Sequence, residues 1–177
     1  VPQWQNKEGI EKMYSNLLGT VSHGTMRPQD MVPAFLQCLN EISESNHPEA
    51  NMAGAEYVQL TFPAGLPYPY LTDEDDDKYW ESEECSDFVE SLFDLLNDYA
   101  PDFCYFGAHQ GDGSDYGFWV SSESLDDATR DGELPRIDDT SKLDTFEHGP
   151  VLEINDHGNA TLWAKNEESW FTVWAVV

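Results

Sequence analysis

Histidine and aspartate side chains in two turn-like segments are the residues of this sequence best suited to catalysis or metal binding. His109, Asp112 and Asp115 lie in a glycine-rich stretch, and His157 lies in a later one. Imidazole and carboxylate groups bind zinc in hydrolases, where the metal activates water. A small metal-dependent hydrolase is therefore one function to consider, but the chain has no metalloprotease, phosphate-loop or nucleophile motif that would fix these residues together.

The glycine-rich stretch also matches a calcium-binding loop in part. The residues at positions 1, 3, 6 and 12 of such a loop would be Asp112, Ser114, Gly117 and Glu123. Tyr116 would stand at position 5 and supplies no carboxylate, and no helical pattern flanks the loop. We therefore predict a hairpin loop between aromatic strands, with no metal site, no cofactor and no catalytic residue.

The charge of the chain is strongly negative and unevenly spread. Its 35 acidic and 8 basic residues give a net charge of −27 at pH 7, and residues 73–98 hold twelve acids and one base, Lys78. Nucleic acids and anionic membranes repel such a chain, whereas cationic partners attract it. We therefore predict no direct nucleic-acid binding, no membrane association, and a basic protein surface as the partner.

Residues 83–99 are predicted to form a helix with one acidic face and one apolar face. Ser82 suits the N-cap, and Pro101 lies just beyond the end. At 100° per residue, a group of carboxylates falls within an arc of about 80°. The group is Glu83, Asp87, Glu90, Asp94 and Asp98, which we call the acidic stripe. Apolar residues such as Phe88, Leu92 and Leu96 fall on the opposite side.

A single file of carboxylates can occupy a groove that a basic protein builds for a phosphate backbone. Acids four residues apart on a helix repel each other by a few tenths of a kcal/mol per pair, and no base on the stripe relieves them. We therefore predict a DNA mimic that inhibits or regulates a basic nucleic-acid-binding protein. Beside the stripe, the contact would include Asp73, Asp75, Asp76 and Asp77.

Other interpretations of the acidity stay open. An immunity-type protein that neutralises a basic toxin would have the same electrostatics and a different partner. The acidic face could also serve only solubility. Adaptation to high salt would spread acids evenly and reduce large apolar residues, whereas this chain has six Trp.

The cysteines predict reduced thiols rather than a disulfide framework or a zinc site. Cys38, Cys85 and Cys104 are odd in number, widely spaced, and flanked by apolar or aromatic residues. Reduced thiols are typical of the cytoplasm. No apolar run approaches the roughly 20 residues of a membrane span. We therefore expect the protein in the cytoplasm.

The hydrophobic periodicity predicts an α+β fold in a single domain over residues 1–177. Helices are expected over 10–18, from Asp30 to about 42, and over 83–99, and the N-terminal helices should pack on an antiparallel sheet with the acidic helix inserted. The expected strands are 57–62, 103–108, 116–120, 151–155, 160–165 and 170–177, the last three as a meander. Residues 63–82 should be an exposed proline-rich and acidic loop. Residues 121–149 should be acidic and irregular, with one short helix near 124–130.

Two segments carry a resemblance to a known group of proteins. The segments YFGAHQGDGSDYGFW (105–119) and NDHGNATL (155–162) are similar to a family of small acidic proteins encoded by phages and plasmids. The similarity covers residues 85–175 approximately. The family has no assigned activity or catalytic residues. The resemblance therefore implies a mobile-element setting, in which inhibitors of host defence or host DNA metabolism are common.

Overall fold

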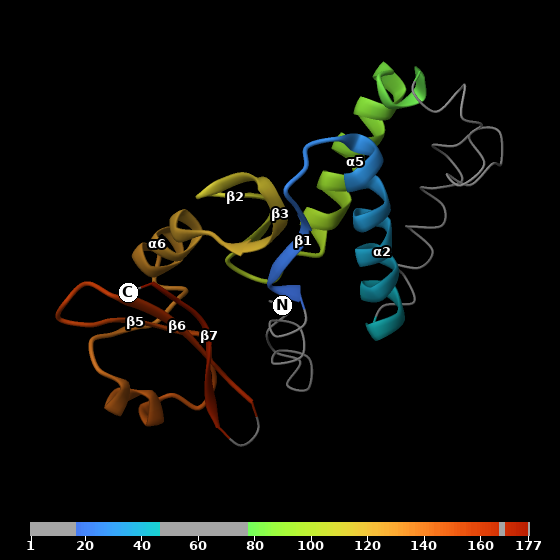
Figure 1. The fold of residues 1–177 in the computed structure, drawn as a ribbon. Coiled ribbons are helices and arrows are strands. Elements are labelled where there is room, and N and C mark those ends of the chain that lie inside the picture. The colour runs from blue at the N-terminus through green and yellow to red at the C-terminus, as the bar shows by residue number, and fades with distance from the viewer. Residues whose placement is uncertain (1–16, 47–77, 167–168, 177) are drawn as a thin grey trace. The chain divides into compact units, whose positions relative to one another are not determined.

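The structure of the chain is a computed structural model that describes residues 17–46, 78–166 and 169–176 (Figure 1). Helices and two separate sheets make up this part of the chain, so the fold is α+β, as the periodicity predicts. The chain divides into two compact units. The helical unit contains Thr20–Tyr99 and Phe106–Gly117, and the meander unit contains Ala100–Tyr105 and Phe118–Val177 together with the residues up to Gly19.

The helical unit is organised by two helices, α2 (Pro28–Asn46) and α5 (Glu83–Asp98). The three-stranded sheet has the order β1-β3-β2. Its strands are β1 (Gly19–His23), β2 (Cys104–His109) and β3 (Asp112–Val120), of which β2 and β3 continue into the meander unit. Aromatic rings join helices and strands: Phe35 of α2 lies edge-on to Phe93 and Phe106, each at 5.1 Å between ring centroids. Tyr116 of β3 lies 5.5 Å from Phe93.

Helix α2 begins earlier than its sequence pattern predicts. We expected the helix to start at Asp30, but the carbonyl of Arg27 already accepts from the backbone N–H of Asp30 at 3.0 Å and of Met31 at 3.1 Å. Pro28 then takes the first helical position, where a missing N–H costs nothing. Asp30 lies in the first turn and accepts a hydrogen bond from the Thr25 hydroxyl at 2.8 Å.

The loop between β2 and β3 is much shorter than the glycine-rich sequence suggests. The strands extend to His109 and start again at Asp112, so only Gln110 and Gly111 form the connection. In this turn the Gly111 N–H donates to Nδ1 of His109 at 3.1 Å. The prediction of a hairpin between aromatic strands is therefore confirmed, and its glycine-rich residues are mostly part of the strands.

Several predicted elements lie outside the described residues. These are most of the helix at 10–18, the strand at 57–62, and most of the predicted loop at 63–82, including Asp73, Asp75, Asp76 and Asp77. Within the described end of that loop, Lys78–Trp80 are helical and Trp80 is buried, so the prediction of an exposed loop is wrong for this part. At the end of the first of these segments, Leu18 forms a bridge with Phe118 and Gly19 begins β1 with φ +124°. The prediction that the helix reaches Leu18 is therefore wrong, and a strand that the sequence pattern did not predict follows this residue.

The meander unit contains the predicted C-terminal meander. Strands β5 (Val151–Ile154), β6 (Ala160–Lys165) and β7 (Trp170–Val176) pair antiparallel in sequence order. The short strand β4 (Arg136–Ile137) adds to β5 in parallel and completes the four-stranded sheet β4-β5-β6-β7. One core cluster contains Val120, Leu125, Ala128, Leu134, Leu152 and Leu162. A second contains Ile137, Leu143 and Val151.

The segment 121–149 is more ordered than its composition predicts. Helix α6 (Ser122–Arg130) matches the predicted short helix, but β4 and the 3-10 helix η3 (Thr140–Thr145) follow it. Few buried side chains hold these additions in place, and they are separated along the chain: Leu134, Ile137 and Leu143. Such isolated apolar residues in an acidic stretch give no periodic pattern.

Candidate partner-binding surface

Helix α5 begins and ends where its sequence signals place it. The Ser82 hydroxyl accepts from the Cys85 N–H at 3.2 Å and donates to the Tyr79 carbonyl at 2.6 Å, so it caps the helix and ties it to the preceding turn. Glu83 and Glu84 stand in the first turn, where the helix dipole favours negative charge. Tyr99 is the C-cap, and its N–H donates to the Leu96 carbonyl at 3.1 Å.

The buried face of α5 fixes the rotation of the helix about its axis. Cys85, Phe88, Leu92 and Leu96 are each fully buried, as the predicted phase requires. At the C-terminal end, Oδ1 of Asn97 accepts the backbone N–H of Phe106 at 3.0 Å, which ties the helix to strand β2. A helix held by both apolar packing and a side-chain hydrogen bond cannot turn its opposite face inward.

The acidic stripe lies on that opposite face. Glu83, Asp87, Glu90, Asp94 and Asp98 are all exposed. Among the described residues, none of these carboxylates takes part in an ion pair. The last turn of α5 also contains no base, so the negative charges of Asp94 and Asp98 add to the negative end of the helix dipole. Within the described part of the chain, the stripe is therefore a row of negative charges without an ion-pair partner.

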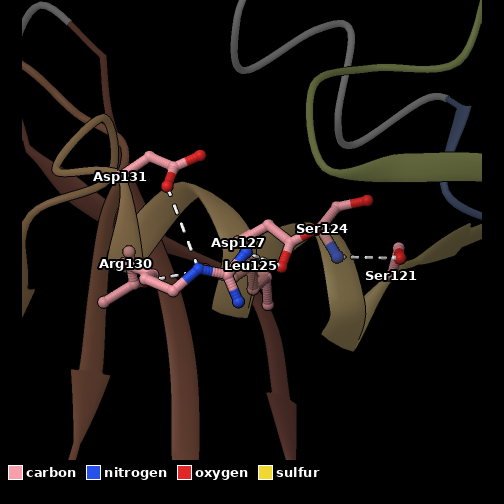
Figure 2. A network of polar contacts seen from close by, with 7 residues as sticks. Ser121, Ser124, Leu125, Asp127, Arg130 and Asp131 are labelled. Atoms are coloured by element: carbon pink, nitrogen blue, oxygen red, sulfur yellow. Dashed lines mark hydrogen bonds and ion pairs between the residues drawn. The ribbon is translucent and has the colours of Figure 1, made fainter.

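Some acids elsewhere in the described chain do form ion pairs with bases close to them in sequence. In α6 the Arg130 guanidinium lies 2.6 Å from Oδ1 of Asp127 and 3.9 Å from Oδ1 of Asp131 (Figure 2). Lys142 pairs in the same way with Asp138.

The four residues of the hydrolase hypothesis belong to two different compact units of the chain. His109 and Asp112 flank the β2–β3 turn, while His157 lies in the β5–β6 turn of the meander unit. Oδ1 of Asp115 is buried and has no hydrogen-bond partner among the described residues. The described part of the chain contains no group of three or more His, Cys, Asp or Glu side chains that could hold a metal ion.

Asp112 is held by the hairpin itself. Its Oδ1 accepts the backbone N–H of Ser114 at 2.9 Å and the Ser114 hydroxyl at 2.8 Å, and these hydrogen bonds lower the pKa of the carboxyl group. His23 and His109 lower this pKa further through their charge. Because Ser114 donates to the carboxylate and not to an imidazole, it is not arranged as an activated nucleophile.

His23 is a neighbour of Asp112 that the sequence pattern did not indicate. Its Nε2 lies 3.6 Å from Oδ2 of Asp112, and the adjacent Gly24 N–H donates to the Ser114 carbonyl at 3.0 Å. His23 ends strand β1, which has only five residues. The alternation of Thr20, Val21, Ser22 and His23 between two glycines was the available signal, and it is too short to distinguish a strand from a loop.

The partial calcium-loop match is also explained by the strands. Residues 112–120 form one continuous extended strand, whereas an EF-hand loop folds around the ion. Glu123, the residue at the last loop position, belongs to helix α6. The match therefore reflects residue types and not a loop conformation.

The thiols have the character expected of structural cysteines. All three are free, with Cys85 buried and the other two partly buried. Burial, with a smaller contribution from Glu41, raises the pKa of Cys38 to about 11. Burial, assisted by Asp102, raises the pKa of Cys104 to about 12. These thiols therefore stay protonated near neutral pH and are poor nucleophiles and metal ligands.

Comparisons with known proteins do not place the chain in a family. No family, no curated protein and no solved structure matches it. In the described residues there is also no helix with the length and apolar character to cross a membrane.

Proposed function

We propose that this chain is a non-enzymatic acidic binding protein, a DNA-mimic-type inhibitor or regulator of a basic nucleic-acid-binding protein. The observation that supports the proposal best is the acidic stripe of α5, in which every carboxylate is exposed and none has an ion-pair partner among the described residues. The opposite face of the helix is buried, so the stripe is presented by a rigid element.

The spacing of the stripe suits a surface that binds a phosphate backbone. Neighbouring stripe residues are three or four positions apart and rise about 4.5–6 Å along the helix. From Glu83 to Asp98 the row rises about 22 Å, a length over which one DNA strand presents about six or seven phosphates at 3.4 Å each. A row of Lys or Arg that follows one strand would thus meet several of these carboxylates together.

The energetics favour contact with a cationic surface. Each exposed pair of opposite charges contributes little by itself, about 0–1 kcal/mol. A row of charge-assisted hydrogen bonds that a basic groove shields from water is stronger. Helix α5 itself contains no base that would reduce the repulsion between the carboxylates of the stripe. Binding to a cationic surface would reduce this repulsion. The attraction should fall as salt rises, because salt screens exposed charges beyond about 10 Å at 0.1 M.

The biological setting belongs to the same proposal. The resemblance to small acidic proteins of phages and plasmids suggests that the chain acts in a host cell. Its partner would then be a host protein of defence or DNA metabolism. Asp73, Asp75, Asp76 and Asp77, which precede the stripe in the sequence, would add to the contact.

The proposal can be tested by capture and DNA competition. The chain, immobilised at low salt, should retain a basic protein from a host lysate, and duplex DNA should release that protein. Release by DNA that weakens as salt rises would support a shared binding surface. A captured protein that salt releases but DNA does not would indicate an immunity-type role against a basic toxin. Failure to retain any basic protein at low salt would contradict the proposal.

A further inference from the structure

We draw no further inference here: the strongest candidate, the outer edge of strand β7 at the margin of the four-stranded sheet, is uncharged over Trp170–Val176 and has no further strand beside it among the described residues, but the β-bulge opposite Leu162 and Trp163 interrupts it as a pairing template, and nothing in the described part of the chain shows what would cover it.

Discussion

Leu92 is the residue that most directly couples the core of the helical unit to the position of the acidic stripe. It is fully buried on α5, and Glu90 and Asp94 on either side of it along the chain are exposed. Leu92→Ala should therefore lower the free energy of unfolding by about 2–5 kcal/mol, through lost apolar contact and a residual cavity. Urea denaturation would measure the change. Glu90→Ala on the same helix is the control and should stay within about 0.5 kcal/mol; equal effects would mean that the helix phase is wrong.

In the meander unit, stability depends on close packing around Gly149. A Cβ added at this position would lie 3.0 Å from the Ala164 Cα, the Lys165 backbone N and the Trp170 ring. Backbone atoms cannot move aside as a flexible side chain can, so Gly149→Ala should cost about 1–3 kcal/mol. Gly113→Ala adds the same methyl group to open space and should be nearly neutral. Thermal melts of the two variants would test this, and a stable Gly149→Ala protein would contradict the close approach.

The raised pKa values of the thiols predict that Cys38 and Cys104 react slowly with alkylating reagents. At pH 8 a thiol with a pKa of about 11 is thiolate about 100-fold less often than one at the ordinary 9.0. Alkylation of Cys38 by iodoacetamide should therefore be slower by roughly that factor in the folded protein, and Cys104, at about 12, should be slower still. Peptide mass mapping over time would follow both sites. The rates should rise to those of ordinary thiols in denaturant, and fast labelling without denaturant would contradict the burial of either thiol.

Within helix α5, the acids at the two ends of the stripe have opposite effects on the stability of the helix. Glu83 stands at the positive end of the helix dipole, whereas Asp98 stands at the negative end in a turn without a base. Asp98→Asn should therefore raise the free energy of unfolding by about 0.3–1 kcal/mol at low salt, and Glu83→Gln should lower it by a similar amount. Both differences should shrink in high salt. Chemical denaturation at the two salt concentrations would show whether the signs are opposite; equal signs would contradict the dipole argument.

Helix α5 and the meander were predictable because their signals are local. Ser82 as cap, the period of Phe88, Leu92 and Leu96, and Pro101 beyond the end define α5 without reference to any other part of the chain. Strands β5 to β7 alternate and are joined by short turns, so their pairing is also local.

The elements that sequence reasoning missed depend on distant partners. Strand β4 has two residues and exists because Arg136 and Ile137 pair with Leu152 and Glu153. Strand β1 pairs with β3, far along the chain, and this pairing is what brings His23 to Asp112. Propensity over such short stretches is weak, and only the tertiary contacts specify the conformation. The acidic face of the candidate site was therefore predictable, while the neighbour of Asp112 was not.

For the whole molecule, the positions of the negative charges and their total number have different effects on binding. The net charge of −27 attracts any cationic partner at long range, wherever the acids lie. The proposed function requires more, namely that the carboxylates of α5 make the contact. Two variants with the same net charge separate these effects, because each replaces four exposed acids by Asn or Gln.

The stripe variant changes Asp87, Glu90, Asp94 and Asp98. The control variant changes exposed acids of the meander unit that lie in no ion pair among the described residues: Asp126, Glu133, Asp144 and Glu147. Neither set includes a buried residue, so both variants should fold. Circular dichroism and melting temperature would confirm this before any binding is compared.

The affinity of the captured basic partner for these two variants, measured by calorimetry at one low salt concentration, tests the central claim most directly. If the stripe makes the contact, the stripe variant should lose at least roughly 100-fold in affinity, because each lost contact is charge-assisted and about 1.4 kcal/mol corresponds to a factor of ten. The control variant should lose less than roughly tenfold, mainly through slower association. Equal losses in the two variants would show that only bulk charge matters, and would contradict the assignment of the acidic stripe as the binding surface.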